Sequence, residues 1–119
     1  MNKAQKKELD DLWKFVIFKK YGKKCAICGA KKYIQAHHFI TRSNYRLRWD
    51  VRNGVPLCRG HHFFYAHVKP QDFEEWFITK RPKDLLYIKI AKHSQSKQDY
   101  FAIKLKLEQE LEEIEREVR

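Results

Sequence analysis

The sequence has no long hydrophobic run and very little cysteine. No apolar stretch approaches the roughly 18 residues of a membrane-spanning helix, and the lysine-rich beginning lacks the apolar stretch of a signal peptide. We therefore expect a cytoplasmic protein without a membrane partner, in a compartment where cysteines stay reduced. Three cysteines are an odd number, and two of them form Cys25-x-x-Cys28. This pattern favours metal binding over disulfides.

Internal repeats and low-complexity tracts are also missing from these 119 residues, which suffice for one compact domain with a modest core. The hydrophobic content of 43% excludes disorder by composition. We expect a single α+β domain over residues 1–119, with an N-terminal helix (1–24), a core (25–78) and C-terminal helices (79–119). A structural metal ion would help to stabilise a chain of this size.

Acidic residues are scarce relative to basic ones. The chain has 26 Lys and Arg against 15 Asp and Glu, a net charge of +11. The last fifteen residues hold six glutamates and only three basic side chains, so the positive charge is concentrated in the first 104 residues. A body this basic favours a polyanion such as DNA as its partner. Charge alone does not exclude a basic protein that binds no nucleic acid.

Hydrophobic periodicity and turn residues predict the elements of structure. Helices are expected over 3–20, 59–68 and 71–80, from Pro82 through Ile90, and again after the polar segment 93–98. Strands are expected over 32–40 and 54–58, where Pro56 marks an edge position, with a loop over 41–53. The helical spacing of the aromatic residues Phe63, Phe64, Trp76 and Phe77 predicts core positions.

The last helix carries a narrow apolar stripe made of Ile103, Leu107, Leu111, Ile114 and Val118. The opposite face of this helix is charged. We expect it to pack on its own domain, and the alternative is a contact with a second copy or another protein.

Two short motifs place four soft ligands at fixed spacing. Cys25-x-x-Cys28 is followed thirty residues later by Cys58-x-x-His61. Each short loop presents two ligands to one ion, which is what a closed tetrahedral zinc site needs. We predict a structural Zn²⁺ there. The alternative, three buried free cysteines, leaves the spacing unexplained.

The zinc site uses His61 and leaves its neighbour His62 without a structural role. His37-His38, Asn53 and His62 follow one another inside the Cys25-x-x-Cys28 … Cys58-x-x-His61 frame. This order resembles the HNH endonucleases and their ββα-metal core over residues 25–78. The stretch "QAHHFITRS…LRWDVRNGVPLC" is similar to phage-associated HNH proteins, including the NinG-type phage recombination proteins. Two departures are His61 in place of a second distal cysteine, and His67 five residues after His62, where such families often have four.

The resemblance implies a metal-dependent endonuclease that hydrolyses phosphodiester bonds in DNA. It implies that His38 is the general base, that His37 and His62 hold a catalytic divalent cation (Mg²⁺, Mn²⁺ or a transition metal), and that Asn53 ties the loop that positions His38. Adjacent strand residues point to opposite faces, so His37 and His38 are not expected to bind one ion together. An ordinary Asn-Gly turn is the alternative for Asn53. His67 is either a further ligand of the catalytic ion or a surface or core histidine, and both interpretations stay open.

Four arginines crowd the loop beside the proposed base, with Tyr45 and Trp49 between them. Arg42, Arg46, Arg48 and Arg52 suit contacts with DNA phosphates, although a solvated loop would have the same composition. His93 lies outside the motif and is expected at a solvated helix end. Two other functions stay open: a non-catalytic zinc module that binds nucleic acid, and a junction-directed phage recombination nuclease. A phage protein could then be the partner of the last helix.

Overall fold

A two-stranded antiparallel sheet lies at the centre of the molecule. The computed structural model describes residues 1–94 and 97–117, and its strands are β1 (Ile34–His38) and β2 (Gly54–Cys58). The register pairs Ile34 with Cys58 at one end and His38 with Gly54 at the other. The cysteine end and the histidine end of the hairpin are therefore separated by the length of the strands. Both predicted strands are confirmed, although β1 is shorter than 32–40.

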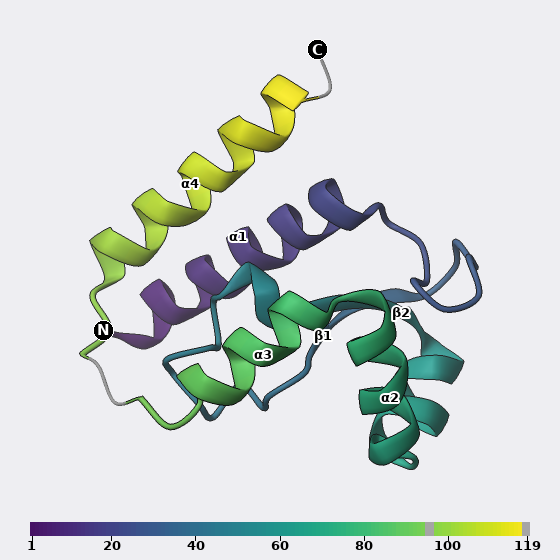
Figure 1. Ribbon diagram of the computed structural model, residues 1–119. Coiled ribbons are helices and arrows are strands. Elements are labelled where there is room, and N and C mark those ends of the chain that lie inside the picture. Colours follow the sequence, from purple (N-terminus) through teal and green to yellow (C-terminus); the bar gives the residue numbers. More distant parts are fainter. Residues whose placement is uncertain (95–96, 118–119) are drawn as a thin grey trace.

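Two long helices lie on one side of this hairpin, one against the strands and the other beyond it (Figure 1). Helix α1 (Lys3–Tyr21) begins with a capping box between Asn2 and Gln5, and ends at Gly22, which takes a positive φ of 86°. Helix α4 (Tyr100–Glu117) packs on α1, and Leu107 is its buried residue. Its stripe contacts the same cluster through Ile103, Leu111 and Ile114, so packing on its own domain is confirmed there. Val118 lies outside the described residues.

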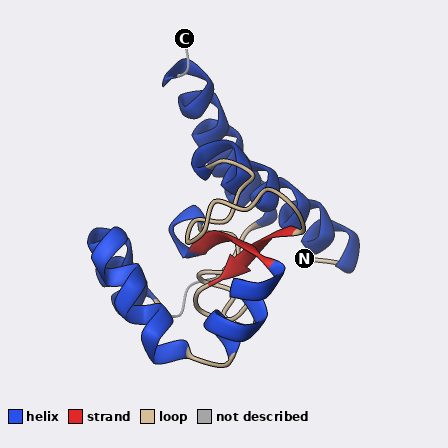
Figure 2. Ribbon diagram, turned by 90° about the vertical axis from the view of Figure 1, so that its right-hand side faces the viewer, coloured by secondary structure: helices blue, strands red, loops and turns tan. Residues whose placement is uncertain are grey.

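Two shorter helices lie on the other side of the hairpin (Figure 2). Helices α2 (Pro70–Lys80) and α3 (Pro82–Ala91) each begin at a proline, where the missing N–H is not needed. Their buried residues form a second core cluster with Val55 and Leu57 of β2. The hairpin is thus held between two apolar clusters, and the α+β prediction is confirmed. None of the helices in the described part of the chain has the length and apolarity needed to cross a bilayer.

Two short helical segments complete the described structure, η1 (Val51–Asn53) and η2 (His61–His67). The helix predicted over 59–68 is present, but residues 61–67 are wound as a π-helix rather than an α-helix. The core prediction is wrong for Phe63 and Phe64, which are 58% and 67% exposed, because no element in the described part of the chain covers this face of η2. Phe77 is buried and Trp76 partly buried, as predicted.

Candidate metal centres and the histidine cleft

The four residues of the predicted zinc frame meet at the cysteine end of the hairpin. Cys25, Cys28, Cys58 and His61 place their ligand atoms within 4.8 Å of one another. The Sγ atoms of Cys28 and Cys58 are 3.8 Å apart, and Nδ1 of His61 lies 3.3 Å from Sγ of Cys58 and 3.7 Å from Sγ of Cys25. A tetrahedral zinc ion with ordinary bond lengths would separate two sulfurs by about 3.8 Å, and a sulfur from a nitrogen by about 3.5 Å. The cluster therefore has the dimensions of a structural zinc site.

The turn that carries Cys25 and Cys28 has a backbone conformation that suits metal binding. Gly29 takes a positive φ of 77°, which lets its N–H bond the carbonyl of Cys25 at 2.9 Å. Burial alone would raise the pKa of the Cys25 thiol, but backbone hydrogen bonds, the largest from Cys58, lower it below its ordinary value. A thiolate is the form that binds metal, so the turn favours the ligand form of Cys25.

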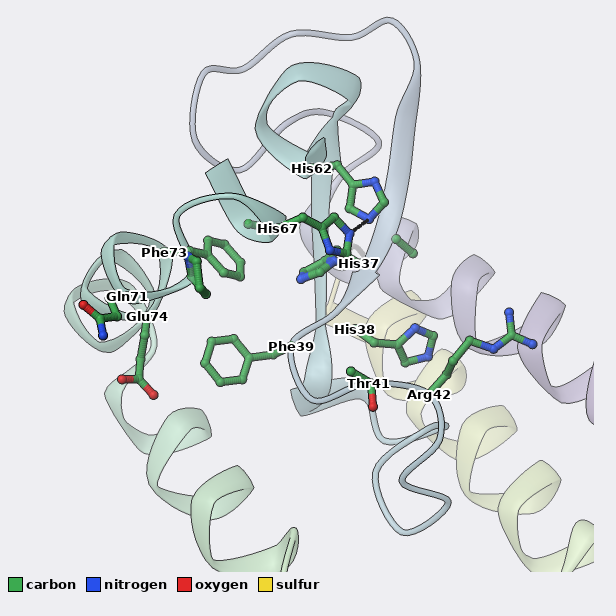
Figure 3. Close-up of a pocket in the computed structure, with 13 residues that line it drawn as sticks. His37, His38, Phe39, Thr41, Arg42, His62, His67, Gln71, Phe73 and Glu74 are labelled. Carbon is green, nitrogen blue, oxygen red and sulfur yellow. Dashed lines mark hydrogen bonds between the residues drawn. The ribbon is translucent and has the colours of Figure 1, made fainter. Parts of the chain in front are cut away.

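A second cluster, made only of histidines, lies further along the hairpin. His37 of β1 meets His62 and His67 of η2, and their ring nitrogens lie within 4.8 Å of one another (Figure 3). Nε2 of His62 and Nε2 of His67 are 3.1 Å apart. Two imidazole nitrogens bound to one ion, each about 2.1 Å from it, would be separated by about 3.0 Å at an angle of 90° and by about 3.4 Å at the tetrahedral angle. These three side chains could therefore hold a metal ion.

The π-helical winding of η2 explains the spacing of this cluster. A π-helix joins residue i to residue i+5, and such turns are frequent at functional sites. His62 and His67 are five residues apart, so this winding brings them to one face. The departure from the four-residue spacing thus does not separate His67 from His62. Burial, followed by the neighbouring charge of His62, lowers the pKa of His37 to about 3, so its ring is neutral and able to bind an ion.

His38 points away from this cluster and packs against α1. Its ring stacks on Trp13, with centroids 4.0 Å apart and an interplanar angle of 10°. Nε2 of His38 is 2.9 Å from the carbonyl oxygen of Arg48. A carbonyl only accepts, so Nε2 is the protonated nitrogen and Nδ1 is left with its lone pair. Burial lowers the pKa of His38 below its ordinary value, which favours this neutral form.

Asn53 is fully buried and ties the loop that carries this carbonyl. Its side chain donates to the carbonyls of Ile40 and Leu47, at 2.9 and 3.1 Å, and accepts from the N–H of Ile40 at 2.7 Å. Its backbone carbonyl accepts from the N–H of Phe39. Asn53 therefore fixes both ends of segment 40–47, next to His38. This is more than the local turn that an Asn-Gly pair would make.

The arginines of the loop have different environments. Arg48 is 7% exposed and makes a bidentate pair with Asp10, at 3.0 and 2.7 Å. The guanidinium of Arg48 is therefore engaged with Asp10 in this structure, and the phosphate contact expected of it stays a prediction. Arg52 pairs with Asp50, and Arg46 donates to the hydroxyl of Tyr87 at 3.2 Å. Arg42 is the most exposed, with a side chain that is 66% accessible.

An open cleft of about 790 Å³ joins these parts. It is lined by His37, His38, Arg42, His62 and His67, together with residues at the start of α2 that include Gln71 and Glu74 (Figure 3). One opening is thus lined by the histidine cluster, by His38 with the lone pair of its Nδ1, and by an exposed arginine. His93 is exposed just after α3, as expected, and lines no part of the cleft.

Two residues that support this cleft were not predicted from the sequence. Asp10 accepts from Arg48 and from Nε1 of Trp49, the latter at 2.8 Å. Trp13 stacks on His38 and donates from Nε1 to the carbonyl of Asp50 at 2.8 Å. Both lie on α1, more than twenty residues before the histidines. Their only sequence signal was membership of an amphipathic helix, which does not distinguish them from other helix residues.

Comparison of the chain with protein-family models, with curated proteins and with solved structures gave no match.

Proposed function

We propose that the protein is a metal-dependent endonuclease of the HNH type, which hydrolyses phosphodiester bonds in DNA. The observation that carries the proposal is one cleft that contains a three-histidine cluster and a separate histidine with a free ring nitrogen. The order of β1, β2 and η2 supports a ββα-metal core, framed by the candidate zinc site. The basic body of the chain supports a polyanionic substrate.

The two adjacent histidines divide the work in this proposal. His37 faces η2 and serves as a ligand, whereas His38 faces α1 and serves as the general base. Because Nε2 of His38 is held by the carbonyl of Arg48, Nδ1 is the atom that accepts a proton from water. Trp13 restricts rotation of the ring by stacking on it. Asn53 and Asp10 act through the loop and are positioning residues.

The reaction follows from these positions. Water attacks the phosphorus as its proton moves to Nδ1 of His38, and the bond from phosphorus to the 3′ oxygen breaks on the opposite side. The 3′ oxygen leaves and takes a proton from solvent, so the products carry a 5′ phosphate and a 3′ hydroxyl. An ion held by His37, His62 and His67 would supply Lewis-acid stabilisation of the charge on the phosphate. Arg42 would bind a neighbouring phosphate of the same strand.

The donor set of this cluster bears on which ion is bound. Three neutral imidazoles suit transition metals, whereas Mg²⁺ prefers oxygen ligands and octahedral geometry. We therefore expect Mn²⁺, Co²⁺, Ni²⁺ or Zn²⁺ to support cleavage at lower concentrations than Mg²⁺. Conversion of supercoiled plasmid to nicked or linear product, across a series of each ion, measures this order. The same gel distinguishes cutting of one strand from cutting of both.

Two variants separate the base from the ligand. His38→Ala should lower the rate about 10²–10⁴-fold, the usual contribution of a positioned general base, with the metal dependence unchanged. His62→Ala should instead shift the metal concentration required for half-maximal rate upward, and added ion should recover part of the rate. His93→Ala is the matched control, because His93 is exposed outside the cleft.

Both active-site variants should keep the zinc content and melting temperature of the wild type, since neither residue belongs to the zinc cluster. If His38→Ala cleaves plasmid as fast as the wild type, the HNH mechanism is wrong. A wild-type protein that binds DNA and cleaves none with any ion would be a zinc-containing binding module instead.

A further inference from the structure

The face of η2 that points away from the cleft is apolar and exposed. Phe63, Phe64 and Val68 are 58%, 67% and 60% exposed, and the rings of the two phenylalanines meet edge to face with centroids 5.0 Å apart. Two adjacent exposed phenylalanines lose the free energy that burial of either would contribute. Exposed apolar patches of this kind mark binding surfaces.

The winding of η2 places this patch directly beside the histidine cluster. The i to i+5 spacing that places His62 and His67 on one face also places Phe63 and Val68, the residue just after η2, on the neighbouring face. The patch is therefore a strip along the same segment, one residue further round the helix from the two candidate ligands. It flanks the cleft without lining it.

The charge around the patch selects the kind of partner. Segment 59–69 carries Arg59 and Lys69 at its two ends and no acidic residue. Both cations are exposed, and neither belongs to an ion pair among the described residues. Aromatic side chains flanked by cations are the arrangement with which proteins bind single-stranded nucleic acid, since bases stack on the rings while phosphates meet the charges.

We propose that Phe63 and Phe64 form a stacking platform for unpaired nucleobases, which directs the protein to DNA with exposed bases, such as gaps, bubbles and branches. The proposal rests on the proposed nuclease function in one respect, namely that a DNA strand occupies the cleft beside the platform. Bases of an intact duplex are stacked on one another and do not offer their faces to the platform. Gapped DNA offers such faces within reach of the cleft, so the platform gives a preference for structure rather than for sequence.

The test measures binding rather than cleavage, with the His38→Ala background so that the DNA stays intact. The probes are a 30-base-pair duplex and the same duplex with a three-nucleotide gap in one strand. Both carry 2-aminopurine in the continuous strand, at a position that is paired in the intact duplex and lies opposite the gap in the gapped probe. The background protein should bind the gapped probe more tightly and quench its fluorescence. The double variant Phe63→Ala/Phe64→Ala should lose this preference, because its affinity for the gapped probe should fall by about 5-fold to 150-fold per stacked base. Its affinity for the intact duplex, and the salt dependence of that affinity, should be unchanged.

Two further variants give the experiment its specificity. Phe63→Leu/Phe64→Leu keeps an apolar surface and removes the aromatic faces, so it should behave like the alanine pair. Phe101→Ala/Leu105→Ala removes an equally exposed apolar pair from α4, 72% and 57% accessible, and should leave both probes bound as before. Zinc content and melting temperature of each variant show that the fold is retained.

Several results would overturn the proposal. Equal affinity for the two probes, or a leucine pair that retains the preference, would exclude base stacking. Sedimentation showing self-association that the alanine pair abolishes would make the patch a contact between copies of the chain. Failure of the nuclease proposal is recognised separately, by absence of metal-dependent plasmid cleavage by the wild type, whereas the stacking result depends on binding alone.

Discussion

The hydrogen bond that orients His38 depends on residues that do not line the cleft. The carbonyl that accepts from its Nε2 belongs to Arg48, and Arg48 is held by Asp10 of α1. A single carboxylate therefore connects the first helix to the proposed base. Burial alone would raise the pKa of Asp10, but the hydrogen bonds from Arg48 and Trp49 outweigh it and keep the pKa below its ordinary value.

Asp10→Asn should consequently lower the free energy of unfolding by about 1–2 kcal/mol at neutral pH, because Arg48 would keep its buried charge without a full partner. A carboxyl with a lowered folded-state pKa stabilises the fold above its unfolded pKa, and this stabilisation is lost as the pH falls through the folded value. The difference between the wild type and Asp10→Asn should therefore shrink in acid. Urea unfolding across a pH series measures it, and a difference that is constant with pH would contradict the role given to Asp10.

Gly54 is the second residue on which the position of His38 depends. It pairs with His38 across the sheet, and a Cβ there would overlap Ile17 and lie 2.8 Å from the ring of Trp13. Gly54→Ala should lower the free energy of unfolding by about 1–3 kcal/mol through overpacking, and should lower the cleavage rate because Trp13 is displaced. Thermal melting and plasmid nicking report the two effects.

Gly60 provides the control for this substitution. Its backbone is already helical, with φ −64° and ψ −50°, and nothing lies within 4 Å of an added Cβ. Gly60→Ala should leave stability unchanged or raise it by up to about 1 kcal/mol. Equal destabilisation by the two substitutions would show that the close approach of α1 to Gly54 is not the cause.

At the scale of elements, the hairpin keeps the two candidate metal sites apart while η2 contributes to both. His61 faces the cysteines and His62 faces His37, so one peptide bond separates a structural ligand from a proposed catalytic one. The register of β1 and β2 then determines the distance between the clusters. Loss of either cluster should therefore have a distinct consequence.

Chelator-washed protein should retain about one zinc per chain, bound by Cys25, Cys28, Cys58 and His61. Cys25→Ser should lose this zinc and much of the fold, because a structural zinc contributes folding free energy directly. His62→Ala should retain the zinc and melt like the wild type. Elemental analysis measures the zinc content and calorimetry the melting temperature of each protein. A metal-free protein that melts at the same temperature would contradict the prediction of a structural zinc site.

The elements that the sequence predicts best are those with local signals. The two x-x-spaced ligand pairs and the periodic helices require no knowledge of distant residues, so α1, α4 and the meeting of Cys25, Cys28, Cys58 and His61 were predictable. The π-winding of η2 was not, because periodicity in a short segment does not distinguish one helical pitch from another. The exposure of Phe63 and Phe64 was missed for a related reason: helical spacing tells which residues share a face, and not whether another element covers it.

The arrangement of the whole molecule separates its charges. The acidic helix α4 lies on the far side of α1 from the hairpin (Figure 1), whereas the loop with Arg42 opens into the cleft. Six of the fifteen acidic residues are thus placed on an element that lines no part of the cleft. If the partner is a polyanion, as proposed, such a separation would orient it toward the histidines before any contact is made.

Binding to duplex DNA should therefore weaken steeply with salt, and Arg42 should account for a defined part of this dependence. Arg42→Ala should weaken binding to all sequences alike and reduce the slope of log K against log[salt] by about 1, the contribution of one phosphate contact. Arg116→Ala is the matched control, since Arg116 is equally exposed on α4 and pairs with Glu112. Fluorescence anisotropy at several salt concentrations measures both slopes. If Arg42→Ala and Arg116→Ala change the slope equally, binding depends on total charge alone and the cleft has no privileged part in holding DNA.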